Sequence, residues 1–243
     1  MIKKLVAFGC SWTFGDELND PELAHEKDNP RYWDMNTPYR LAHAYPGLIA
    51  KHYGLEYENH AFPGHSLVSM REVATWYVKN HDVADTLFLV GLTESWRWSW
   101  HNNKHYSGKG DPEWNRHVNS SWLLHGMGNY SSSWKETFRS YMEDQLCEEL
   151  QIKNKDQTLL FFDGIAARYN VPVVQYSMLE TMSNEIPVLT HAYPEENANQ
   201  MIINTGSRPR DVFAPGKHPN EQGHEIIANR LINYIDSAKI LEC

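Results

Sequence analysis

The sequence has little basic charge, and it lacks long hydrophobic runs. Its 243 residues include 22 basic and 31 acidic side chains, which gives a formal net charge of −9 and a pI near 5.8. Such a chain presents no basic field that would attract phosphate, so we do not expect a nucleic acid or an anionic membrane surface as its partner. No segment approaches the roughly 20 apolar residues that a membrane-spanning helix requires.

Cysteine is also scarce. Cys10, Cys147 and Cys243 are odd in number and far apart, and no pair has the spacing of a zinc site or a redox CxxC motif. This favours a reducing compartment, so we expect a cytoplasmic protein. The apolar start, 1–8, is too short for a signal peptide and fits a first strand better. Thirteen histidines are present, but no HExxH, HxH or GxGxxG pattern occurs, so we predict neither a metal nor a cofactor.

Short apolar runs alternate with longer helical patterns, which is typical of a parallel sheet covered by helices. The chain is long enough to bury a core, so we predict one α/β domain over 1–243, with a polar, Trp-rich insertion at about 94–135. Residues 178–210 look irregular. The expected strands are 5–8, 57–61, 86–92 and 171–177, and the expected helices are 39–53, 66–80, about 136–169 and 220–235.

Polar and glycine residues follow the first three expected strands directly, and a similar segment precedes the last helix. These segments are 9–16, 59–66, 91–97 and 216–224. In an open parallel sheet such positions share the carboxyl edge, where ligands bind. We therefore expect four segments that are distant in sequence to converge in space.

A serine, a glycine-rich turn and a histidine that converge in this way suit acyl transfer. A serine hydroxyl attacks well only when an imidazole takes its proton. Backbone N–H groups must also face the oxygen that becomes negative in the tetrahedral intermediate. Gly64 suits that role, because without a Cβ its amide can approach a ligand closely. The other reading of Ser11 is that it caps a first helix.

These segments resemble the ordered blocks of the SGNH (GDSL-like) hydrolases. The matching blocks are 9–12 (GCSW), the turn 59–64, the third strand with its glycine, and 218–224 (HPNEQGH), while 94–200 is largely unmatched. The resemblance implies a flavodoxin-like three-layer α/β/α fold and an ester or acetyl hydrolase activity. By carry-over, Ser11 is the nucleophile and His218 its base. The amides of Ser11 and Gly64 then form the oxyanion hole, and Asn59, in the same turn as Gly64, is expected to contact the substrate.

The sequence departs from the family pattern at two functional positions. Thr93 stands where the family has an Asn that donates to the oxyanion, and because a hydroxyl can still donate, we expect Thr93 to hold the oxyanion with the two amides. Pro215 stands where the family has an Asp, three residues before the histidine. The group that orients His218 is therefore open. The candidates are a main-chain carbonyl, Asp211 and Glu94.

Nine tryptophans are more than a core requires, and six of them lie in or at the edge of the insertion. Trp96, Trp98 and Trp100 alternate, so in an extended segment they share one face. They either pack the insertion onto the sheet or form a platform for a sugar ring or an acyl chain beside the active edge. Trp12 adjoins the proposed nucleophile, and Arg97 is either solvated or faces an anionic group of the substrate.

The sequence thus predicts a serine hydrolase that cleaves an ester or acetyl group on a small polar or carbohydrate-like substrate through an acyl-enzyme. One alternative is an acyltransferase that uses the same serine and histidine. Another is a catalytically weakened binding protein that keeps the fold and recognises a glycan or a partner through the Trp-rich insertion. The sequence gives no indication of the oligomeric state.

Overall fold

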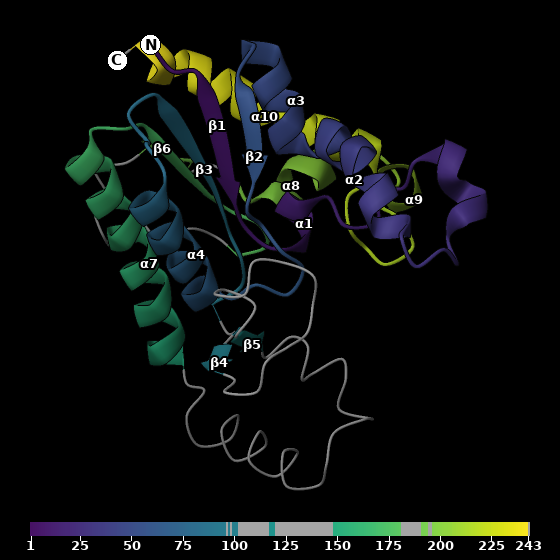
Figure 1. Ribbon diagram of the computed structural model, residues 1–243, viewed down its shortest axis with the longest axis horizontal. Coiled ribbons are helices and arrows are strands. Elements are labelled where there is room, and N and C mark those ends of the chain that lie inside the picture. The colour runs from purple at the N-terminus through teal and green to yellow at the C-terminus, as the bar shows by residue number, and fades with distance from the viewer. Residues whose placement is uncertain are drawn as a thin grey trace, which may run out of the picture.

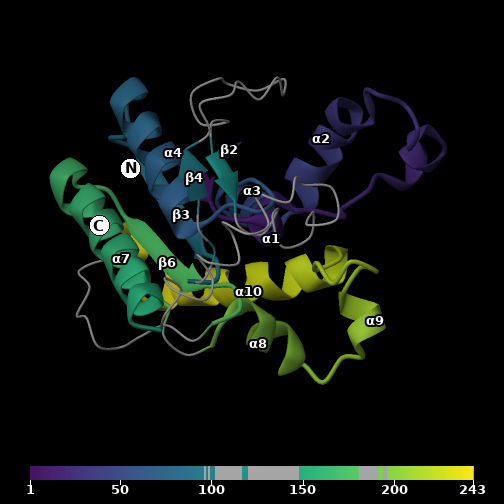
Figure 2. The ribbon, with the colours of Figure 1, turned by 90° about the horizontal axis from the view of Figure 1, so that it is seen from below.

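The computed structural model describes residues 1–95, 97, 99–101, 117–119, 148–180, 191–193 and 196–242. Its centre is a five-stranded sheet with the order β2-β1-β3-β6-β7, in which all pairs are parallel (Figure 1). The strands are β1 (Lys4–Phe8), β2 (Glu56–Asn59), β3 (Thr86–Leu92), β6 (Val173–Ser177) and β7 (His191–Ala192). Helices cover both faces of the sheet, as the view from below in Figure 2 also shows. The predicted three-layer α/β/α fold is therefore confirmed.

Alternate residues of the strands face two separate cores, because successive side chains of a strand point to opposite faces. Val6 and Phe8 pack with helices α4 (Leu67–Asn80) and α7 (Glu148–Tyr169). Leu5 and Ala7 face the other layer, which contains α3 (Tyr45–Tyr53), α8 (Ala198–Ile203) and α10 (Glu221–Ser237). Strand β3 is buried along its whole length, as expected for a central strand covered on both sides.

The predicted helix at 39–53 is in fact two helices, α2 (Tyr32–His43) and α3, separated by an extended residue at Ala44. Pro46 lies in the first turn of α3, where its missing N–H costs nothing. Inside one continuous helix the same proline would remove a hydrogen bond and clash with the preceding turn, which favours a break here, although α2 accommodates Pro38 in its interior.

The prediction that 178–210 is irregular was wrong for part of its described residues. These contain the edge strand β7, helix α8 and the start of the short helix α9 (Pro209–Val212). Elements of this length carry too little periodicity to be detected in a sequence. The remaining elements are α1 (Ser11–Phe14), η1 (Pro21–Glu26), β4 (Ser99–His101), β5 (His117–Asn119) and η2 (Ile240–Glu242).

Strands β4 and β5 form an antiparallel pair within the expected insertion. Trp96 and Trp98 lie outside the described residues, so the predicted aromatic platform is not described.

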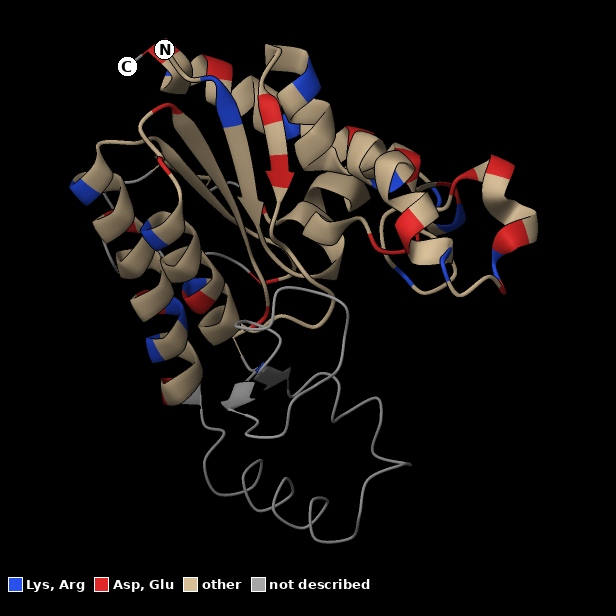
Figure 3. Cartoon of the chain, in the orientation of Figure 1, with Lys and Arg blue, Asp and Glu red and all other residues tan. Residues whose placement is uncertain are grey.

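Among the residues that are described, no helix is long and apolar enough to cross a membrane. In the cartoon of Figure 3, the positions of acidic and basic residues are interspersed along the helices.

Candidate active site

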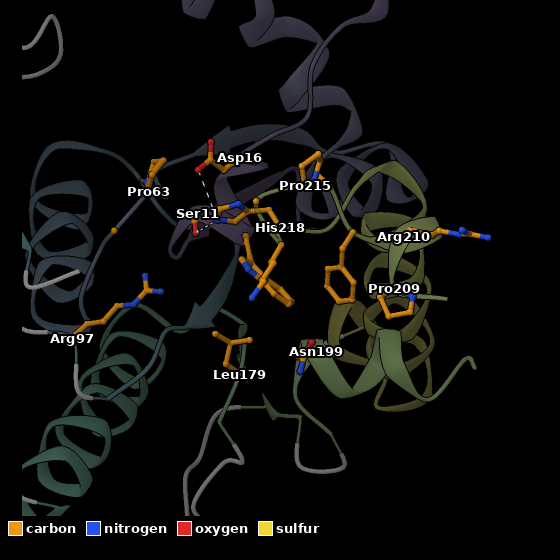
Figure 4. A pocket seen from close by; sticks show the side chains of 16 residues that line it. Ser11, Asp16, Pro63, Arg97, Leu179, Asn199, Pro209, Arg210, Pro215 and His218 are labelled. Carbon is orange, nitrogen blue, oxygen red and sulfur yellow. Dashed lines mark hydrogen bonds and ion pairs between the residues drawn. The ribbon is translucent and has the colours of Figure 1, made fainter. Parts of the chain in front are cut away.

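A pocket of about 1210 Å³ opens beside the carboxyl ends of the sheet strands. Ser11, Gly64 and His218 all line it, although they come from three distant segments of the chain (Figure 4). Parallel strands deliver their following loops to the same edge, and this is the cause of the convergence. The predicted meeting of the nucleophile segment, the glycine turn and the C-terminal histidine is therefore present in the structure.

Ser11 is presented by a sharp turn between β1 and α1. At Gly9 a Cβ atom would lie 1.9 Å from Oγ1 of Thr13, so only glycine fits there. Gly15 ends the helix in the left-handed conformation, with φ of 81°. The Ser11 side chain faces the pocket, and its Oγ lies 3.0 Å from Nε2 of His218. Ser11 is the first residue of α1, but Cys10 is the N-cap and makes no side-chain capping bond, so capping does not account for the serine.

His218 lies in a loop that its backbone holds in place. Phe213 and Pro219 form an isolated antiparallel bridge, and the amide of Ala214 donates to the His218 carbonyl at 2.8 Å. Asn220 then caps α10 through a bond from the Gly223 amide. The histidine is thus fixed outside the helix, as expected of a residue that directly precedes a proline.

Glu17 is the partner of the second imidazole nitrogen. Its Oε2 lies 2.8 Å from Nδ1 of His218 and 3.3 Å from the His218 amide nitrogen, while its Oε1 accepts from the Gly216 amide at 2.8 Å. Burial opposes the charge of this carboxylate, but the three hydrogen bonds outweigh it, and the pKa of Glu17 is lowered. An ionised carboxylate at Nδ1 holds the tautomer in which Nε2 can accept a proton from Ser11.

The two carboxylates among the three candidates for this place, Asp211 and Glu94, do not occupy it, and neither does a main-chain carbonyl, because Nδ1 of His218 bonds to Glu17. Asp211 receives a hydrogen bond from Nε of Arg208 at 2.8 Å instead. Glu94 accepts from the Thr93 hydroxyl at 2.9 Å and pairs with Nε of Arg97 at 2.5 Å. Both expectations are corrected, because these local partners hold the two acids away from the imidazole.

Sequence reasoning missed Glu17 because it looked for the acid near the histidine. Glu17 instead follows the nucleophile segment, and its backbone has φ of 66°. This left-handed conformation is unfavourable for a residue with a Cβ. The only available signal was the pair of acids directly after Gly15, at the end of a segment already expected at the carboxyl edge.

Asp16 is a further carboxylate next to the imidazole. Its Oδ2 lies 3.8 Å from Nε2 of His218, and its Oδ1 accepts from the amide of Glu17 at 3.2 Å. Burial raises the pKa of Asp16, even though the neighbouring His218 acts in the opposite direction.

Of the residues expected to supply oxyanion donors, Ser11 and Gly64 line the pocket and Thr93 does not. Gly64 lines the pocket with φ of 81°, a conformation that suits glycine. Within the described part of the chain, the amide of Ser11 has no hydrogen-bond acceptor. The Thr93 hydroxyl, in contrast, has its single hydrogen bonded to Glu94. The expectation that Thr93 donates to an oxyanion is therefore not met in this arrangement.

Asn59 is a structural residue here and does not line the pocket. Its amide nitrogen donates to the Thr13 carbonyl at 3.0 Å, and its Oδ1 accepts from the Ala61 amide at 3.0 Å. These bonds tie the loop after β2 to helix α1. The expectation that Asn59 contacts substrate is corrected, since both ends of its side chain are already bound.

Trp12 and Phe213 form an apolar wall of the pocket. Their ring centroids are 6.0 Å apart, and both residues line the cavity. Arg97 faces the cavity from the loop after β3 (Figure 4). Trp96, expected beside it, lies outside the described residues.

Buried polar groups support the nucleophile turn from below. Tyr176 bonds to the Tyr45 hydroxyl, which donates to Oγ1 of Thr13 at 2.7 Å. His224 stacks on Tyr45 with ring centroids 5.7 Å apart, and its Nδ1 accepts from the Tyr45 amide at 3.2 Å. Burial lowers the pKa of His224 to about 3, so this histidine is neutral. His224 is therefore a packing residue of the buried layer.

No cluster of three or more His, Cys, Asp or Glu side chains is placed to hold a metal ion within the described ranges.

Comparisons with known proteins give structural likenesses only. No family model and no curated protein matches the chain. A carbohydrate esterase structure is similar at 14% identity and a TM-score of 0.44, covering 98% of this chain and 66% of that one. LAE5, an alpha/beta hydrolase enzyme from the metagenome of Lake Arreo, Spain, is similar at 13% identity and a TM-score of 0.49, covering 96% and 95%. The psychrotrophic esterase EstA from Pseudoalteromonas sp. is similar at 10% identity and a TM-score of 0.45, covering 97% and 98%.

This chain thus spans just under two thirds of the carbohydrate esterase chain. The parallel five-stranded sheet between two helix layers is the three-layer α/β/α fold that the sequence resemblance implied. At such identities and TM-scores the likenesses add nothing about activity.

Proposed function

We propose that the chain is a serine hydrolase that cleaves an ester or acetyl group through an acyl-enzyme. One observation carries the proposal: Oγ of Ser11, the imidazole of His218 and the carboxylate of Glu17 form a continuous chain with separations of 3.0 and 2.8 Å. The geometry is that of a nucleophile, a general base and a group that orients the base.

In the first step, Ser11 Oγ attacks the ester carbonyl while Nε2 of His218 takes its proton. Glu17 stays ionised and stabilises the imidazolium that forms. The amides of Ser11 and Gly64 are the proposed donors to the oxyanion, since both residues line the pocket. The imidazolium then returns the proton to the leaving alcohol, and water releases the acid in a second cycle of the same kind.

The substrate is proposed to be a small polar or carbohydrate-like ester. A cavity of about 1210 Å³ has room for more than a short acyl chain. The Trp12 and Phe213 rings, inclined at 55° to each other, supply apolar surface, and Arg97 supplies polar contact on another wall. Aromatic rings of this kind suit either the face of a sugar or an acyl chain.

Covalent labelling tests the proposal directly. A fluorophosphonate probe is expected to label the folded wild-type chain, and Ser11→Ala is expected to abolish labelling and ester hydrolysis. Ser237→Ala is the matched control, because that exposed serine at the end of α10 bonds only to the Tyr234 carbonyl. A panel of p-nitrophenyl esters then bounds the acyl length. A folded wild-type chain that neither reacts with the probe nor cleaves any ester would refute the hydrolase and favour the binding protein.

A further inference from the structure

Asp16 is a carboxylate near the imidazole that takes no part in the hydrogen bonds linking Ser11, His218 and Glu17. Its Oδ2 is 3.8 Å from Nε2 of His218, the same nitrogen that Ser11 Oγ approaches to 3.0 Å. Its other oxygen accepts from the Glu17 amide, which fixes the orientation of the carboxylate. The side chain is 22% exposed and lines the pocket, as Figure 4 shows. Asp16 therefore borders the space next to Nε2 on the substrate side.

In the second half of the proposed cycle, that space has a defined occupant. The molecule that attacks the acyl group must give its proton to Nε2, so its oxygen has to lie within hydrogen-bond reach of that nitrogen. A separation of 3.8 Å between Nε2 and Oδ2 of Asp16 is too long for a direct hydrogen bond and leaves room for one bridging water. A water with bonds of about 2.8 Å to both atoms would have an angle of roughly 85° at its oxygen, which bent hydrogen bonds tolerate.

The number of hydrogens distinguishes water from an alcohol at this position. Water carries two, so it can give one to Nε2 and hold the other on Asp16. An alcohol has only one, and Nε2 requires it. The alcohol oxygen would then turn its lone pairs toward the Asp16 carboxylate, which repels them. An ionised Asp16 thus favours water over an alcohol as the acceptor of the acyl group.

We infer that Asp16 positions the hydrolytic water and makes the site a hydrolase rather than a transferase; this rests on the proposed function. The water oxygen forms a bond to the acyl carbon while one of its protons moves to Nε2 of His218. The bond between that carbon and Ser11 Oγ then breaks, Ser11 takes the proton from Nε2, and the carboxylic acid leaves. Asp16 holds the second hydrogen throughout and remains a positioning residue.

The test measures how much of the acyl-enzyme passes its acyl group to water and how much passes it to methanol. The wild-type chain and Asp16→Asn are given the best p-nitrophenyl ester with methanol in the buffer, and free acid and methyl ester are quantified. Asp16→Asn should slow release by water about 10- to 100-fold, as expected for loss of a charged hydrogen bond. The methyl ester to acid ratio should rise by a similar factor, and a burst of p-nitrophenol should appear. Asp34→Asn, an exposed aspartate on α2, is the matched control and should leave the ratio unchanged.

The ratio does not depend on how much of a variant is folded, and Asp16→Ser should shift it in the same direction. An unchanged ratio in both variants would overturn the inference while leaving the hydrolase intact. An equal loss of acylation and of release to both acceptors would also overturn it, because it would indicate a general effect on His218. A wild-type chain without any probe labelling would defeat the proposed function itself, and the inference with it.

Discussion

The Glu17→Gln substitution replaces one carboxylate oxygen with an NH₂ group and leaves the shape of the side chain unaltered. Both oxygens of Glu17 act only as acceptors, Oε1 from the Gly216 amide and Oε2 from Nδ1 and the backbone amide of His218. The glutamine NH₂ group must therefore face a donor in either orientation. If it faces Gly216, that exposed amide loses its acceptor to a second donor. If it faces His218, the imidazole must present an unprotonated Nδ1.

The second orientation abolishes catalysis, because the remaining proton then sits on Nε2 and Ser11 cannot transfer its own. The first keeps the tautomer but removes the negative charge that stabilises the imidazolium, and a charged hydrogen bond contributes about 1.5–3 kcal/mol. At about 1.4 kcal/mol per factor of ten, the charge alone accounts for roughly 10- to 100-fold. With the wrong tautomer included, kcat/KM should fall by about 10²- to 10⁴-fold, with KM nearly unchanged.

The assay is steady-state hydrolysis of a p-nitrophenyl ester, combined with the rate of fluorophosphonate labelling. Asp211→Asn is the matched control, because that residue pairs with Arg208 at the surface and should alter kcat/KM less than about twofold. A Glu17→Gln variant that keeps more than about a third of the activity would refute the assignment. An inactive Asp211→Asn variant would show instead that Asp211 moves to the imidazole during turnover.

Two further predictions concern residues outside the hydrogen-bonded group of Ser11, His218 and Glu17. Thr93→Val removes a hydroxyl that bonds to Glu94, so kcat should fall less than about tenfold; a loss of 10²- to 10³-fold in the ester assay would restore Thr93 to the oxyanion hole. His224 has a folded pKa of about 3 against about 6.5 when unfolded, so the folded state binds fewer protons between these values. The neutral His224 therefore leaves the free energy of unfolding at its full value above about pH 6.5. As the pH falls, the unfolded state gains a proton at this histidine, and the free energy of unfolding is lower by about 2 kcal/mol at pH 5. His224→Gln should flatten this dependence in urea unfolding at pH 7.5 and 5, and an unchanged slope would contradict it.

The sequence indicated where the nucleophile and the base would meet. Ser11 and His218 are 207 residues apart, yet each lies next to a well-patterned element, a buried strand and an amphipathic helix. Parallel topology then brings such positions to one edge. Long-range convergence was predictable here because it follows from the order of the elements.

Features that depend on irregular backbone could not be predicted in this way. Glu17 reaches the imidazole only because its backbone is left-handed, a conformation that nothing in its residue type favours. Thr93 and Glu94 follow a well-predicted strand, but their mutual hydrogen bond withdraws both from the roles suggested by sequence position. The two-residue strand β7 is too short for any periodicity.

Ser11 and Glu17 belong to one short stretch of chain, whereas His218 arrives from the far end of the fold. Two of the three groups are therefore held together by local turns, and one long-range event brings His218 to them. That event is the docking of α10 against α3, which His224 and Tyr45 mark with a buried contact. Recovery of esterase activity during refolding should then report the attachment of the C-terminal helix, and activity should return with that final assembly step rather than with formation of the sheet.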